Sequence, residues 1–152
     1  MAIQIDDIDK KILNLLASNA RIPFLEIARI CNVSGAAIHQ RVNKLEEAGL
    51  FKGSCYLVEE KALGYFTCAY VGVHFEKGGV YQSVLEKIKQ IPEVVECHYT
   101  TGAYGLLLKI YARDNSHLMQ ILSIQIQEIP GVASTETFIS LDQPIHRQVT
   151  IQ

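Results

Sequence analysis

The sequence lacks a hydrophobic run long enough to cross a membrane. None of its apolar stretches approaches the roughly 18–20 residues that a transmembrane helix requires. The first residues, Met1–Asp7, become acidic at once and contain no basic segment followed by an apolar one, so no secretory signal is expected. These absences predict a cytoplasmic protein without a membrane partner.

Cysteines are few, and none of them forms a CxxC pair. Cys31, Cys55, Cys68 and Cys97 are separated by 24, 13 and 29 positions. Metal centres use closer spacing, and disulfide frameworks form in oxidising compartments. Each cysteine lies in an apolar stretch, so we expect four small buried hydrophobic residues and no metal or other cofactor.

A strong charge of either sign is also missing. The chain has 14 Lys and Arg residues against 16 Asp and Glu, and its net charge is −2. A nucleic-acid-binding protein usually carries a basic patch. Binding to DNA would therefore depend on how the charges are distributed rather than on their total.

Apolar residues are abundant, at 49% of 152, which predicts packed cores in one medium or two small domains. Residues 6–50 have helical periodicity. A first helix has one apolar face, and Asp6 or Asp7 can cap its start. A second helix covers 24–30 after Pro23, and a third runs from the N-cap Ser34 to about Ala48, before Gly49.

The second and third of these helices, joined by a turn at Cys31–Val33, predict a helix-turn-helix. The third helix can lie in a major groove of DNA, where Gln40 and Asn43 can bind adenine and Arg41 can bind guanine or phosphate. A plain three-helix packing module with a solvated polar face is the alternative. The residues predicted to contact DNA are Ser34, Ala36, Ala37, His39, Gln40, Arg41, Asn43 and Lys44.

The second half alternates strands and helices. Ile91-Pro92-Glu93-Val94-Val95 recurs 38 residues later as Ile129-Pro130-Gly131-Val132-Ala133, and each copy ends a helix before a strand. The pattern predicts an α+β protein with a C-terminal ferredoxin-like βαββαβ domain. Its strands are expected at 66–75, 94–101, 104–112 and 132–141, and its helices at 80–91 and 116–129.

The hairpin and the sheet of this half lead to two further expectations. Thr101–Gly105 is the expected hairpin between the middle strands, with glycines available for positive φ. Both faces of strands 66–75 and 104–112 are largely apolar, although two helices can cover only one face of the sheet. The uncovered face is therefore expected to pack against a second copy of the chain.

Over nearly its whole length the sequence resembles the Lrp/AsnC (feast/famine) family of bacterial and archaeal transcription regulators. In the first half the resemblance lies in Asp6–Leu13, Ala20–Ile22, Val33-Ser34, Ile38, Arg41-Val42, Lys44–Glu46 and Gly49-Leu50. In the second half it lies in Ile91–Cys97, Thr101-Gly102, Leu106–Lys109 and Pro130–Val132.

The resemblance implies a helix-turn-helix (winged-helix-like) DNA-binding domain at 1–50, a linker strand at 51–64 and an effector-binding and oligomerisation domain at 65–152. It implies a regulator that is not an enzyme, that binds double-stranded DNA and that forms dimers and larger assemblies such as octamers. It also implies an amino-acid-like effector. The residues expected near the effector are Thr101, Gly102, Ala103, Tyr104, Gly105, Thr135 and Thr137.

One position departs from the family pattern, because Gly105 stands where an acidic residue is usual. A carboxylate there could pair with an effector's ammonium group. Its absence leaves open a different ligand, a site completed by other residues, or no effector.

The sequence also bears on three other functions. An enzyme is not indicated, because the sequence has no phosphate-binding glycine loop, nucleophile elbow or metal-ligand spacing. A heme-linked regulator is not indicated by the five scattered histidines. A small-molecule-binding or protein-interaction oligomer without DNA binding remains the alternative.

Overall fold

The computed structural model describes residues 4–152 and contains two compact units. Unit 1 extends to Leu57 and also includes Ile145–Gln152, and unit 2 comprises Val58–Pro144. The last eight residues were expected to belong to the second domain, but they are part of unit 1, because Ile151 packs against its core. None of the helices among residues 4–152 has the length and apolar character needed to cross a membrane.

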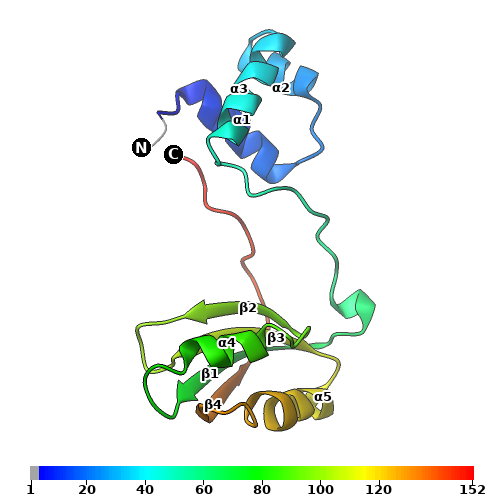
Figure 1. The fold of residues 1–152 in the computed structure, drawn as a ribbon. Helices are drawn as coiled ribbons and strands as arrows, with labels where there is room; N and C mark the ends of the chain where they lie inside the picture. Colours follow the sequence, from blue (N-terminus) through cyan, green and yellow to red (C-terminus); the bar gives the residue numbers. More distant parts are fainter. Residues whose placement is uncertain (1–3) are drawn as a thin grey trace. The chain divides into compact units, whose positions relative to one another are not determined.

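Unit 1 consists of three helices, α1 (Asp7–Ser18), α2 (Phe24–Cys31) and α3 (Gly35–Glu47) (Figure 1). The predicted caps are confirmed. The Asp6 side chain accepts from the N–H of Asp9, and the Ser34 side chain accepts from that of Ala37, which satisfies amides that have no partner within the helix. Asn32 ends α2 with φ of 54°, the left-handed conformation that the turn requires.

The core of unit 1 comes from the apolar faces of all three helices. Ile12, Ile27, Ile38 and Leu45 are fully buried there. The described residues of unit 1 form no strand, so the helix-turn-helix has no wing hairpin within one chain.

The linker strand expected over 51–64 is not formed within the described chain. Residues 51–59 belong to no helix or strand, and Lys61–Leu63 form a short 3-10 helix, η1. A strand needs a neighbour to satisfy its backbone groups, and a single chain offers this segment none. Pairing of the linker with another copy stays a prediction.

Unit 2 contains a four-stranded antiparallel sheet in the order β2-β3-β1-β4. This order and the helix-strand sequence confirm the ferredoxin-like prediction. A π-helix, η2, continues α5. The elements along the chain are β1 (Thr67–Phe75), α4 (Tyr81–Ile88), β2 (Val94–Tyr99), β3 (Leu106–Ala112), α5 (Asn115–Gln120), η2 (Ile121–Ile126) and β4 (Val132–Ile139).

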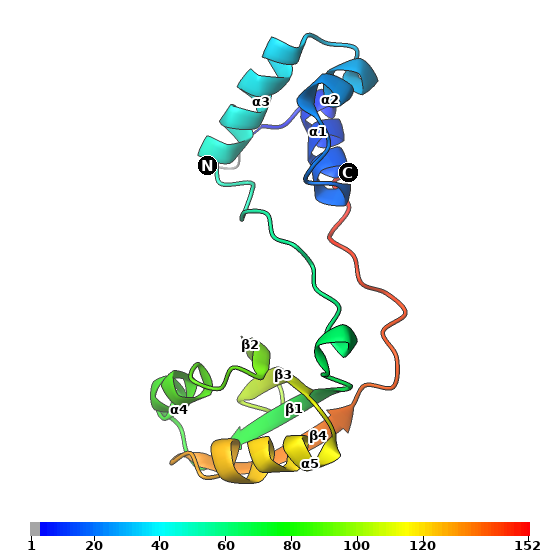
Figure 2. The same ribbon diagram turned by 90° about the vertical axis from the view of Figure 1, so that its right-hand side faces the viewer.

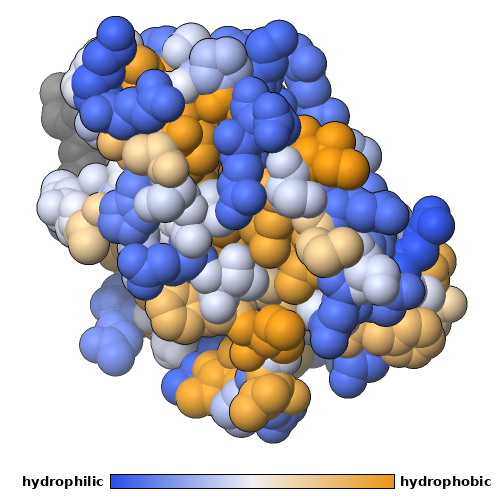
Figure 3. All heavy atoms as spheres, turned by 90° about the horizontal axis from the view of Figure 1, so that it is seen from below, coloured by the Kyte–Doolittle hydropathy of each residue, from blue (hydrophilic) through white to orange (hydrophobic). Residues whose placement is uncertain are grey.

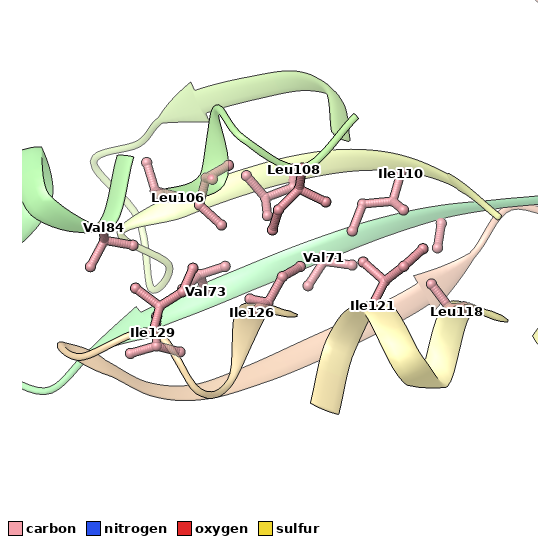
Figure 4. Packing of buried hydrophobic residues seen from close by; sticks show 14 of the residues in the cluster. Val71, Val73, Val84, Leu106, Leu108, Ile110, Leu118, Ile121, Ile126 and Ile129 are labelled. Carbon is pink, nitrogen blue, oxygen red and sulfur yellow. The ribbon is translucent and has the colours of Figure 1, made fainter. Parts of the chain in front are cut away.

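The two helical segments cover the same face of the sheet (Figure 4). Val71 and Val73 of β1 point toward Val84 of α4 and toward Ile121 and Ile126, and all five are fully buried. The internal repeat also appears in the structure as two equivalent turns. The N–H of Val94 donates to Ile91 O at 3.1 Å, and that of Val132 donates to Ile129 O at 3.0 Å.

The opposite face of the sheet, which we call the open face, carries no helix. It includes Tyr70, Gly72 and His74 of β1, with Lys109 of β3 and Phe138 of β4 opposite Tyr70. Phe138 is 53% exposed. Other hydrophobic side chains are also exposed on the molecule, and Figure 3 shows several gathered among hydrophilic ones on the face that it draws.

The expectation that all four cysteines are buried is wrong. Cys31, Cys68 and Cys97 are half-buried and Cys55 is exposed. Cys55 lies in the linker, where no element of the same chain covers it. Burial raises the pKa of the Cys97 thiol, which keeps it in the unreactive protonated form.

Candidate nucleic-acid interface and effector region

The α3 helix has a buried apolar side and an exposed polar side. Ile38, Val42 and Leu45 are at most 3% exposed and belong to the core of unit 1. Figure 2 shows α3 alongside α1 and α2. The opposite side carries the exposed residues Ser34, Ala36, His39, Gln40, Asn43 and Lys44. Six of the eight residues predicted to contact DNA therefore share one solvent-facing surface, which we call the α3 surface.

The start of the α3 surface is built from small side chains. Ser34 Oγ is occupied by the amide of Ala37, and Ala37 is itself half-buried. Ala36 is exposed and its methyl group projects little from the backbone. A ligand can therefore approach the N-terminal turn closely, where the helix dipole favours an anionic group such as phosphate.

His39 lies against the neighbouring helix. Its ring meets Phe24 of α2 edge-on, with ring centroids 4.7 Å apart. Phe24 therefore covers one side of the histidine ring, and among residues 4–152 no aromatic contact of this kind involves the exposed Gln40, Asn43 or Lys44.

Arg41 does not project outward as the sequence predicted. Its Nη1 lies 2.7 Å from Asp6 Oδ2 and 2.7 Å from Asp9 Oδ1, both at the start of α1. Periodicity predicted Arg41 among the outward residues of this helix, but two carboxylates more than 30 positions away draw it inward. The expected outward projection of Arg41 is therefore wrong.

With Arg41 paired, Lys44 is the one cation on the α3 surface. Sequence analysis missed other exposed basic residues of unit 1, which include Lys11 of α1, Arg29 of α2 and Arg21 before α2. Arg21 stacks over the Tyr56 ring at 4.6 Å from the centroid. An excess of basic over acidic residues would have been the signal for them, and residues 1–50 have none.

The hairpin of unit 2 reaches across the open face through Tyr104. The Tyr104 hydroxyl donates to Glu136 Oε2 of β4 at 3.0 Å, and His74 Nε2 lies 3.2 Å from the other oxygen of that carboxylate. The His74 and Tyr104 rings meet edge-on at 5.1 Å. The hydrogen bonds from His74 and Tyr104 lower the pKa of Glu136, so it stays ionised in weak acid.

Glycine is required in this region where an aromatic side chain lies close to the backbone, and not where the backbone has positive φ. Neither Gly102 nor Gly105 has positive φ, contrary to the prediction. A Cβ on Gly105 would overlap the Phe75 ring, and one on Gly72 would overlap the Tyr104 ring. Phe75 therefore occupies the space into which an acidic side chain at position 105 would extend.

The predicted effector residues do not form one cluster. Thr135 and Thr137 pair with Val73 and Val71, so they lie on the helix-covered side of β4, and Thr135 accepts from Gln127 at 2.8 Å. Glu136, which Tyr104 contacts, lies on the open face between them. The remaining predicted residues, Thr101, Gly102 and Ala103, are exposed at the hairpin tip.

A hollow of about 330 Å³ lies beside α5 and β4, and Gln127, the partner of Thr135, lines it. Its other lining residues are mostly apolar and include Met119, Leu122 and Ile139. Residues 4–152 hold no group of three or more His, Cys, Asp or Glu side chains arranged to bind a metal.

Comparison with known proteins assigns both halves of the chain. The AsnC-type helix-turn-helix domain matches residues 5–46, and the Lrp/AsnC ligand binding domain matches residues 68–150. The regulatory protein AsnC of Haemophilus influenzae is 39% identical over 145 residues, which cover 95% of this chain and 97% of that protein.

Solved structures agree with this assignment. The structure of Escherichia coli AsnC superposes with a TM-score of 0.92 at 37% identity, covering 97% of this chain and 99% of that chain. The transcriptional regulator NMB0573 of Neisseria meningitidis, solved as a complex with L-Met, has the same fold, with a TM-score of 0.90 at 22% identity over 95% of this chain and 94% of that chain. The chain described here therefore belongs to the Lrp/AsnC family of transcriptional regulators.

Proposed function

We propose that this regulator binds double-stranded DNA by placing the α3 surface in a major groove. The observation that carries the proposal is the division of α3 into a fully packed apolar side and an exposed side that carries Gln40, Asn43 and Lys44. Amide side chains can make paired hydrogen bonds to adenine, and a lysine can bind guanine or phosphate.

Phosphate contacts in this proposal come from Lys44 together with exposed basic residues elsewhere in unit 1. Arg29 is on α2, the helix that crosses the DNA backbone in helix-turn-helix proteins. Unit 1 carries eight Lys and Arg residues against six Asp and Glu, which is only a small basic excess. A single copy would therefore bind weakly, and two copies on one duplex would double the contacts.

A salt titration of binding to a labelled random-sequence duplex tests the proposal. We expect log affinity to fall linearly with log salt, and Lys44→Ala to reduce the slope by about 0.9. Lys87→Ala is the matched control, because Lys87 is an exposed lysine of α4 in unit 2. Absence of binding by the unaltered chain at low salt would refute the DNA-binding function.

Self-association is the second part of the proposed function. The open face leaves Phe138 half exposed beside Tyr70, and a stable interface needs about 800 Å² per partner. We propose a dimer through this face and a larger assembly such as an octamer. Light scattering that returned the monomer mass of 17.0 kDa at micromolar concentration would contradict it.

The third part is an amino-acid-like effector that binds unit 2 near the hairpin Thr101–Gly105. The match to a ligand binding domain supports a ligand, and a relative of the same fold was solved with L-Met. Because Phe75 fills the space beside Gly105, no carboxylate at that position is available to an ammonium group. We therefore expect any such ligand to rely on other polar groups or on apolar contacts.

A thermal-shift screen against the twenty amino acids tests for the effector. A ligand that binds the folded protein alone raises the melting temperature. A shift with L-methionine or another apolar amino acid would support the proposed effector, and no shift with any of the twenty would contradict it.

A further inference from the structure

Arg41 contacts both acidic residues that cap α1. Its Nη1 donates to Asp6 Oδ2 and to Asp9 Oδ1, each at 2.7 Å. Asp9 is only 2% exposed, so its charge is compensated by the protein and not by water. The Arg41 side chain itself is 30% exposed.

Each of the two carboxylates uses one oxygen for the helix cap and the other for Arg41. Asp6 Oδ1 accepts from the Asp9 amide at 2.8 Å, and Asp9 Oδ2 accepts from the Asp6 amide at 3.2 Å, which together form the capping box of α1. The remaining oxygen of each carboxylate binds Arg41. One guanidinium therefore joins α3 to the first turn of α1 through groups whose positions the backbone already holds.

We propose that Arg41 is a positioning residue of the DNA-binding domain, which holds α3 at one rotation about its axis so that the amide side chains of Gln40 and Asn43 face the groove. This inference rests on the proposed DNA-binding function. Arg41 lies between Gln40 and the buried Val42, at the border of the two sides of α3. An anchor at this border opposes rotation of the helix in a way that the non-directional apolar contacts of Ile38 and Leu45 do not.

Direct contact of Arg41 with DNA is the competing role. It would require both 2.7 Å bonds to break and would leave the buried Asp9 carboxylate without its cation. Removing one partner of a buried ion pair is strongly unfavourable. The clamp between Arg41 and the two aspartates is therefore expected to persist on DNA.

The two roles predict different salt dependence for Arg41→Ala. As a positioning residue, Arg41 contributes no counterion release, so the variant should bind random-sequence duplex about tenfold more weakly with an unchanged slope of log affinity against log salt. As a phosphate contact, its removal should reduce the slope by about 0.9, as expected for Lys44→Ala. A reduced slope would overturn the inference.

A double-mutant cycle gives the second readout. If Arg41 acts through Asp9, then Arg41→Ala and Asp9→Asn should be strongly non-additive in both melting temperature and DNA affinity. Additive effects would overturn the inference. If circular dichroism shows that unit 1 is unfolded in Arg41→Ala, Arg41→Gln is used in its place, because glutamine keeps a donor for one carboxylate.

These experiments separate the inference from the function on which it rests. An unaltered chain that does not bind DNA refutes both. A chain that binds DNA with a linear salt dependence but loses slope in Arg41→Ala refutes the positioning role alone and makes Arg41 a DNA contact.

Discussion

Unit 1 and unit 2 differ in how their helices and strands enclose a core. In unit 1, three helices enclose a core, and α3 turns a polar side outward. In unit 2, two helical segments cover one face of a sheet whose other face carries Tyr70 and Phe138 without cover. The difference indicates that unit 1 suits a polar partner such as DNA, and unit 2 suits an apolar partner such as a second copy.

The acidic residues of the two units also connect different elements. In unit 1, Asp6 and Asp9 join two helices through Arg41. In unit 2, Glu136 joins the hairpin to the edge strand through Tyr104 and His74 on the open face. The first cluster stabilises the arrangement of one domain, and the second lies where the proposed dimer would form.

The largest effect is expected from charges on the open face. Tyr70→Asp combined with Phe138→Asp places two carboxylates opposite each other in the β1–β4 register. The proposed interface would have to bury both charges, so the assembly should dissociate to 17.0 kDa monomers in light scattering. Gln82→Asp, at an exposed position of α4, is the control and should leave the assembly intact.

A smaller effect is expected at Gly105. Gly105→Ala forces a methyl group into the Phe75 ring and should destabilise unit 2 by about 1–3 kcal/mol in chemical denaturation. Gly102→Ala is the matched control, because a Cβ added at position 102 would meet nothing within 4 Å, and it should change the stability of unit 2 little. Phe75→Leu should recover part of the loss in Gly105→Ala, and equal stability of both glycine variants would contradict the close-contact explanation.

A still smaller effect is expected where the C-terminal residues join unit 1. The Asn14 amide donates to Ile151 O at 3.0 Å and accepts from Ile151 N at 3.2 Å. Asn14→Ala should lower the stability of unit 1 by about 1–2 kcal/mol, since it removes two partly buried hydrogen bonds. Deleting residues 150–152 should have a similar effect, and no further loss should follow when both changes are combined.

The smallest effect concerns acid stability. The hydrogen bond from the Asp9 amide, followed by that from Arg41, lowers the pKa of Asp6 below its ordinary value. The stabilisation is therefore present above the unfolded pKa of about 3.9 and is lost as pH falls through the folded value. In a series of melting curves, unit 1 should lose stability below about pH 4, and Asp6→Asn should show a weaker dependence on pH there.

Local sequence determined most of the secondary structure. Caps such as Asp6 and Ser34 satisfy amides within three residues, and the Ile-Pro repeat forms the same turn before β2 and before β4. The largely apolar segments 66–75 and 104–112 and the Ile-Pro repeat were enough to predict the strands of the sheet. These signals work because helices, turns and strands depend on neighbours a few positions apart.

Tertiary structure decided the roles of individual side chains in both candidate sites. The polar face of α3 was predicted, but the partners of Arg41 lie more than 30 residues away, and no periodicity indicates which side a border residue takes. The need for glycine at position 105 comes from the Phe75 ring beside it. Tyr104 hydrogen-bonds Glu136 and not the predicted Thr135, and Ile151 hydrogen-bonds Asn14 of α1. All three are contacts between residues far apart in the sequence. Local periodicity specifies elements and their faces, whereas these contacts depend on how the elements pack.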